Sequence, residues 1–164
     1  MIGLMLMLAT PNPLAPASEG KMQCYHPDRA RRTCRSLASY VSRADGGYDN
    51  KAVVLLSATP AVVMTTVTPV VIEGDAVCGA IRPEDLASAE IEVNSSMLSG
   101  DALADARQRI AAAMGGVLGD RICTRYTVDG DALTAEATIN GTPRPDATDT
   151  VIWVSPADGY RVAP

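Results

Sequence analysis

The most distinctive stretch of the chain is residues 24–34, CYHPDRARRTC, which places Arg29, Arg31 and Arg32 between two cysteines. A disulfide between those cysteines would hold the nine residues between them in a constrained loop, and a preorganised loop loses little entropy on binding. Arginine guanidinium groups pair well with carboxylates and phosphates. The stretch therefore predicts a binding surface of Arg29, Arg31 and Arg32 for an anionic component of a cell envelope or an acidic patch on a protein.

Two other interpretations of this stretch stay open. An arginine-bearing loop between cysteines is also what an inhibitor of a secreted hydrolase could present to its target. Alternatively, the stretch is a disulfide-bonded corner whose charges are solvated and bind nothing. The residue types alone do not separate these three roles.

Residues suited to catalysis are few and scattered. His26 is the one histidine of the chain, so Ser-His-Asp or Cys-His chemistry would rest on it alone. The glycine-rich residues 114–120, MGGVLGD, follow a predicted helix, whereas a phosphate-binding loop follows a strand and opens a helix. Carboxylate pairs such as Glu84 and Asp85 have ordinary roles at the start of a helix. We therefore expect no catalytic site and no cofactor, with an enzyme of unrecognised class as an alternative.

Four cysteines, Cys24, Cys34, Cys78 and Cys123, occur in the sequence. Their spacings of 10, 44 and 45 residues match no zinc-ligand pattern, so we expect no metal site. In an exported chain of this size, four cysteines indicate two disulfides, with three possible pairings. The local pairing is Cys24–Cys34, and it leaves Cys78–Cys123 to close a long loop.

The amino terminus predicts export. Residues 1–9, MIGLMLMLA, form an apolar run that resembles the core of a signal peptide and is too short to span a membrane. Residues 15–17, APA, fit a signal-peptidase site, which predicts a signal peptide over 1–17 and one globular domain over 18–164. No Lys or Arg precedes the run, so an upstream start or an N-terminal strand stays open. We expect a periplasmic or secreted protein that is not integral to the membrane.

Composition limits the source and the partners. Twelve arginines against two lysines, together with abundant alanine, are typical of proteins from GC-rich bacterial genomes. The net charge is −5, the sum of +4 over residues 18–43 and −9 over residues 44–164. Nucleic-acid-binding domains carry a basic face and a basic total, so we expect no nucleic-acid partner.

The secondary-structure pattern mixes hairpins with one clear helix. Residues 101–114 repeat apolar side chains at helical spacing and end at two glycines. Residues 34–58 predict a hairpin around a turn at 44–47, although residues 30–41 also fit a helical face. A second hairpin is centred on Asp129-Gly130, and the Pro-rich residues 140–149 predict a loop.

These elements predict an α+β fold, in which an antiparallel sheet of about six to eight short strands packs on the helix at 101–114. Two disulfides would stabilise this single domain. The functional expectation that follows is an exported bacterial binding or interaction module without catalytic activity.

Overall fold

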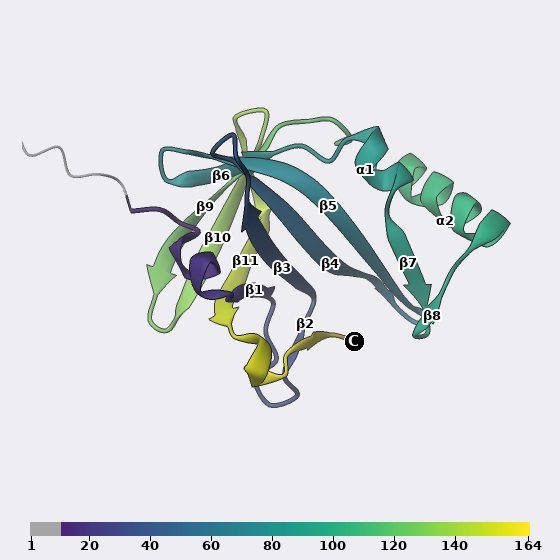
Figure 1. The fold of residues 1–164 in the computed structure, drawn as a ribbon, viewed down its shortest axis with the longest axis horizontal. Helices are drawn as coiled ribbons and strands as arrows, with labels where there is room; N and C mark the ends of the chain where they lie inside the picture. Colours follow the sequence, from purple (N-terminus) through teal and green to yellow (C-terminus); the bar gives the residue numbers. More distant parts are fainter. Residues whose placement is uncertain (1–10) are drawn as a thin grey trace, which may run out of the picture.

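The computed structural model describes residues 11–164 and shows a protein built mostly of antiparallel strands (Figure 1). Its elements in chain order are η1 (Ala15–Glu19), β1 (Met22–Tyr25), β2 (Thr33–Cys34), β3 (Ser36–Ser42), β4 (Tyr48–Ala58), β5 (Ala61–Glu73), β6 (Ala76–Gly79), α1 (Pro83–Ala87), β7 (Glu90–Val93), β8 (Ser96–Met97), α2 (Gly100–Ala113), β9 (Ile122–Asp129), β10 (Ala132–Ile139), β11 (Thr142–Val154), η2 (Pro156–Asp158) and β12 (Arg161–Val162).

Eight of these strands close into a barrel. They run in the order β4-β3-β1-β11-β10-β9-β6-β5, and the pairing of β5 back onto β4 completes the ring. The predicted α+β fold, a sheet packed on a helix, is therefore wrong: the sheet encloses its own core. The closing strands are long, with 11 residues in β4 and 13 in β5, which gives β5 room to pair with β4 on one edge and with β6 and β7 on the other.

One segment whose secondary structure was predicted incorrectly, residues 140–149, contributes to the incorrect fold prediction. The predicted loop at 140–149 is mostly strand β11, which pairs with β10 on both sides of an irregularity. The register passes from the pair Ala137–Arg144 to the pair Ala135–Asp149, so residues 145–148 bulge out of the ladder. Pro145 falls inside this bulge, where its missing N–H breaks no ladder hydrogen bond.

The helix at 101–114 is confirmed as α2, but it does not cover the barrel. With α1 it packs beside the barrel, on the part of β5 that extends to β7 (Figure 1). This satellite core contains Met64, Leu86 and Ile91, while none of the residues of α2 itself is fully buried. The hairpin β3–β4 is also confirmed over its helical alternative, as is the hairpin β9–β10 at Asp129-Gly130.

A short N-terminal segment caps one end of the barrel. Leu14, which precedes η1, is only 1% exposed and packs in one cluster with Tyr40, Val70 and Val77. The predicted signal peptide over 1–17 therefore overlaps a buried residue, and cleavage after Ala17 would remove Leu14. The apolar run at 1–9 lies outside the described residues.

Both predicted disulfides are present. The Cys24–Cys34 bridge packs against Ile152 and Val154, which lie on β11. The Cys78–Cys123 bridge joins two residues directly opposite each other on β6 and β9. Two disulfides are typical of proteins that fold in an oxidising compartment outside the cytoplasm.

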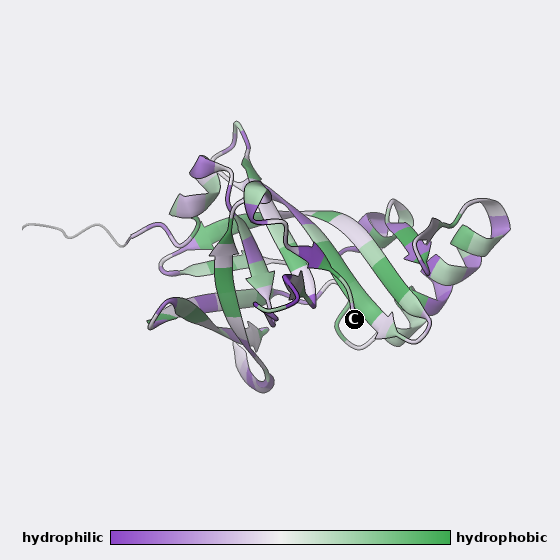
Figure 2. Ribbon diagram, turned by 90° about the horizontal axis from the view of Figure 1, so that it is seen from below, coloured by the Kyte–Doolittle hydropathy of each residue, from purple (hydrophilic) through white to green (hydrophobic). Residues whose placement is uncertain are grey.

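Hydropathy follows the architecture. Hydrophobic residues recur along the barrel strands and on the helices, with polar residues between them (Figure 2). Among residues 11–164, no helix has the length and apolar character needed to cross a membrane.

Candidate functional site

The interior of the barrel holds a cavity of about 210 Å³ that is partly open to solvent. Its lining comes from six barrel strands and from the segment after β6, namely Tyr25, Tyr40, Asn50, Ala52, Val54, Met64, Thr66, Thr68, Val70, Val77, Gly79, Ala80, Ile81, Ile122, Thr124 and Tyr126. An eight-stranded barrel is just wide enough for its own side chains to fill it or for one small ligand. Here the chain has no Phe, and small inward-facing residues leave space.

The alternation of strand residues produces this lining. On β4 the inward positions are Asn50, Ala52 and Val54, and on the facing part of β5 they are Met64, Thr66, Thr68 and Val70. Gly79 completes the wall, because a Cβ atom there would come within 2.9 Å of Val70 Cγ1 and 3.0 Å of the Pro69 carbonyl oxygen.

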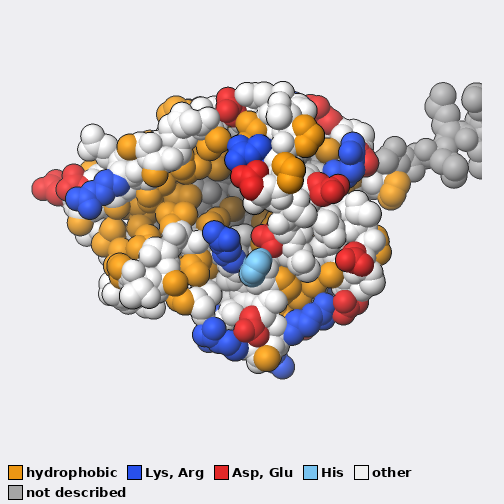
Figure 3. Space-filling model, turned by 180° about the vertical axis from the view of Figure 1, so that it is seen from behind, with side chains coloured by type: hydrophobic (Ala, Val, Ile, Leu, Met, Phe, Trp, Pro, Cys, Tyr) orange, Lys and Arg blue, Asp and Glu red, His pale blue; other side chains and the backbone are white. Residues whose placement is uncertain are grey.

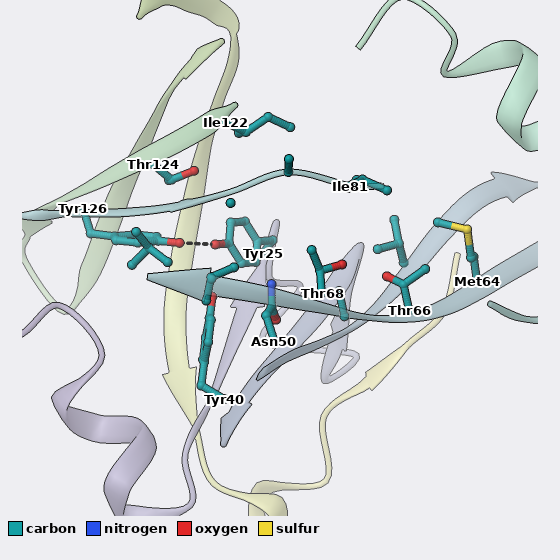
Figure 4. A pocket seen from close by; sticks show the side chains of 16 residues that line it. Tyr25, Tyr40, Asn50, Met64, Thr66, Thr68, Ile81, Ile122, Thr124 and Tyr126 are labelled. Carbon is teal, nitrogen blue, oxygen red and sulfur yellow. Dashed lines mark hydrogen bonds between the residues drawn. The ribbon is translucent and has the colours of Figure 1, made fainter. Parts of the chain in front are cut away.

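One end of the cavity is a cluster of tyrosine hydroxyls, the tyrosine cluster, formed by Tyr25, Tyr40 and Tyr126 around Gln23. Gln23 is completely buried, and its Oε1 accepts a hydrogen bond from Tyr40 at 2.6 Å. Tyr25 and Tyr126 lie 3.2 and 3.3 Å from the same oxygen. Their two hydroxyls share a further hydrogen bond of 2.5 Å (Figure 4).

The tyrosine cluster is uncharged at neutral pH. Burial raises the pKa of both Tyr25 and Tyr40 well above the usual value, and the nearby Tyr126 raises both further, although the hydrogen bond with Tyr25 acts to lower the pKa of Tyr40. Burial also raises the pKa of Tyr126, although hydrogen bonds from the other members act against it. The cluster can therefore donate and accept hydrogen bonds, but it supplies neither a nucleophile nor a counter-charge at neutral pH.

Beside the tyrosines lies an amide with unused hydrogen-bonding capacity. The Oδ1 atom of Asn50 is buried and has no hydrogen-bond partner among residues 11–164, and the same is true of Gln23 Nε2. An unsatisfied buried polar atom costs about 1–3 kcal/mol, so native proteins seldom leave one without a partner. Asn50 lines the cavity and its amide nitrogen points into it (Figure 4). A molecule in the cavity can therefore hydrogen-bond this amide, and rotation of the amide group brings Oδ1 to the same position.

The other end of the cavity is apolar. Met64 and Ile81 lie there, with Thr66 and Thr68 between them and the tyrosine cluster (Figure 4). The edge of β5 that faces away from β4 pairs with β7 up to residue 65 and with β6 from residue 70. On that edge, no described strand pairs with residues 66–69. The molecular surface is hollowed, and hydrophobic side chains gather on the helix-bearing side of that hollow (Figure 3).

The arginines that the sequence singles out lie elsewhere. Arg29 forms an ion pair of 2.9 Å with Asp131, and both side chains are exposed. Arg29 and Arg32 border a shallow polar hollow on the outside of the barrel, which shares no lining residue with the cavity. Arg31 is exposed. Recognition by these arginines stays a prediction.

Neither His26 nor the carboxylate pair Glu84 and Asp85 lines the cavity. His26 is largely exposed, and its Nδ1 lies 3.1 Å from Asp149 Oδ1. The Arg82 guanidinium donates hydrogen bonds to the Asp85 carboxylate at the start of α1. Burial acts to raise the pKa of Asp85, but the hydrogen bonds from Arg82 outweigh it and hold that pKa below its usual value. Within the described residues, no group of three or more His, Cys, Asp or Glu side chains could hold a metal ion.

The cavity and its polar residues were not predicted from the sequence. Gln23 and Tyr25 flank Cys24 in the sequence. They meet Tyr126, about a hundred residues later in the chain, because the strands close into a barrel. The alternation of β4 and β5 is a visible signal that Asn50, Thr66 and Thr68 share a face with apolar residues. The sequence carries no signal that this face closes on itself.

Fold and site together define a closed antiparallel β-barrel with an internal, uncharged cavity. Comparison of the chain with protein-family models, with curated proteins and with solved structures finds no match.

Proposed function

We propose that this protein is an exported bacterial binding module, without catalytic activity, that holds a small and largely apolar molecule in the barrel cavity. Pockets for drug-sized ligands measure about 300–1,000 Å³, so a cavity of about 210 Å³ suits a smaller molecule or one part of a longer one. The two disulfides support a periplasmic or secreted location.

The observation that carries the proposal is the unpaired Asn50 amide in an unfilled barrel interior. A cavity left in a protein core costs about 24 cal/mol of stability per Å³. A barrel that served only as a scaffold would gain stability from a larger side chain at Ala52 or Thr66. Space kept at such a cost, with a polar group facing it, is typical of a binding site.

Filling the cavity tests the proposal. The Ala52→Leu variant places three more carbons inside the barrel, and Ala44→Leu makes the same change in the exposed turn between β3 and β4. The full-length protein would be recovered from its native compartment and the molecules released on denaturation identified by mass spectrometry. We expect a small apolar molecule with the unmodified protein and with Ala44→Leu, and none with Ala52→Leu.

The same variants predict a stability difference. Ala52→Leu should raise the free energy of unfolding of the ligand-free protein by about 0.5–2 kcal/mol, as other cavity-filling changes do. Urea unfolding measures this. A ligand that is retained equally by Ala52→Leu, or its absence from all three proteins, would contradict a binding function of the cavity.

A further inference from the structure

The cavity has a direction, which constrains what it can hold. The tyrosine hydroxyls and the Asn50 amide lie at one end, Thr66 and Thr68 line the middle, and Met64 and Ile81 bound the other end (Figure 4). The tyrosine end adjoins the cluster that contains Leu14 and is therefore the deep end. A ligand that matches this lining places its polar group deep in the barrel and its carbons toward the helices.

Charge restricts the polar group of the ligand. None of the sixteen described lining residues is Asp, Glu, Lys, Arg or His. Burying a charge without a partner is far more costly than burying a neutral polar group that is hydrogen-bonded. A carboxylate, phosphate or ammonium group at the deep end would find no opposite charge there, so an uncharged group is favoured.

Hydrogen bonding restricts the polar group further. Tyr40 already donates its proton to Gln23, and Tyr25 and Tyr126 share theirs with each other and with Gln23. Asn50 is the lining residue whose buried amide oxygen lacks a partner among residues 11–164, and the hydroxyls of Thr66 and Thr68 line the cavity beside it. A group that both donates and accepts, such as a hydroxyl or an amide, satisfies Asn50 in either orientation of its side chain.

Building on the proposed function, we infer that the ligand is an uncharged amphiphile whose hydroxyl or amide group hydrogen-bonds Asn50 and whose carbons extend to Met64 and Ile81. A chain longer than the cavity continues onto the hydrophobic side of the hollow in Figure 3. This assigns the cavity to neutral amphiphiles such as fatty alcohols and fatty amides, rather than to fatty acids or amines.

A matched series of eight-carbon probes tests the headgroup. The full chain, freed of bound molecules on a hydrophobic adsorbent, would be titrated at pH 7 with 1-octanol, octanamide, octanoate and octylammonium in a calorimeter. We expect octanol and octanamide to bind at least about tenfold more tightly than the two ions, and Ala52→Leu to abolish that binding. Octanoate or octylammonium binding as tightly as octanol, and blocked by Ala52→Leu, would overturn the inference and leave the proposed function standing.

Failure of all four probes to bind overturns the inference as well, while the molecule extracted from the native compartment decides the proposed function separately.

A second variant tests the hydrogen bond between the ligand and Asn50. Asn50→Leu keeps a side chain of similar size without an amide, and should weaken octanol by about threefold to tenfold. Octyl methyl ether, which cannot donate a hydrogen bond, is the control and should lose less affinity. Equal losses for the two probes would contradict the role of Asn50.

Discussion

At the scale of single residues, the polar interior depends on three tyrosines that must stay neutral. Their raised pKa values mean that the folded protein holds the phenolic protons more tightly than the unfolded chain does. Their contribution to stability is therefore fully present below the unfolded pKa of about 10 and is lost as the pH rises through the higher folded values.

We accordingly predict that the free energy of unfolding falls steeply above about pH 10. The Tyr40→Phe variant is less stable at neutral pH, because Gln23 loses its hydrogen bond from Tyr40. That variant should nevertheless lose less stability than the unmodified protein between pH 8 and pH 11. Urea unfolding followed at both pH values measures the difference, with Tyr160→Phe, outside the tyrosine cluster, as control. Parallel losses in Tyr40→Phe and the unmodified protein would contradict the argument.

The three arginines of the opening stretch belong to the same scale. Replacing Arg29, Arg31 and Arg32 with Ala should change the free energy of unfolding by about 0.5 kcal/mol or less, since these charges are exposed. If they recognise an anionic partner, the variant should bind anionic phospholipid vesicles more weakly, and the difference should shrink as salt rises. A triple variant of Arg121, Arg125 and Arg144 removes the same charge elsewhere. Equal binding by both variants would mean that Arg29, Arg31 and Arg32 are solvated charges on a disulfide-bonded corner and recognise no partner.

At the scale of elements, local signals predicted local structure well. The helix α2, the turn between β3 and β4 and the Asp129-Gly130 hairpin all depend on residues close together in the chain, and all three are present. Barrel closure depends on β5 pairing with β4 on one edge and with β6 on the other. No local pattern in the sequence encodes those two registers together. The cavity exists because the barrel closes, so it could not be predicted from the sequence either.

The N-terminal segment that caps the barrel overlaps the predicted signal peptide over 1–17. Leu14 directly precedes the predicted signal-peptide cleavage pattern at 15–17, yet it packs in the barrel core. We predict that Leu14→Ala costs about 2–5 kcal/mol in unfolding free energy, the range for a buried leucine. Leu56→Ala, at a side chain that is 42% exposed, should cost less.

A chain beginning at Ser18 would lack Leu14 altogether and should be at least as unstable as Leu14→Ala. Urea unfolding of the three variants, together with the N-terminal sequence of the protein from its native compartment, measures both points. Full stability of the chain that begins at Ser18 would mean that the cap is dispensable, and cleavage after Ala17 would then be compatible with the barrel.

At the scale of the whole molecule, the two disulfides constrain different amounts of chain. Cys24–Cys34 spans 10 residues and fixes the arginine-bearing stretch to the outside of β11. Cys78–Cys123 spans 45 residues, including both α-helices, and ties β6 to β9 across the barrel wall. In the chain-entropy account, a disulfide that closes a longer loop removes more conformational entropy from the unfolded state.

We therefore predict that replacing Cys78 and Cys123 with Ala destabilises the protein more than replacing Cys24 and Cys34, by roughly 4 kcal/mol against roughly 3 kcal/mol. Loss of the longer bridge also frees β6, which forms one wall of the cavity through Val77 and Gly79. The variant without it should thus bind the cavity ligand more weakly, while the variant without the short bridge keeps its affinity. Urea unfolding and calorimetric titration with 1-octanol test the two statements separately. A larger loss from the short bridge would show that packing of Cys24 and Cys34 against Ile152 and Val154 outweighs loop closure.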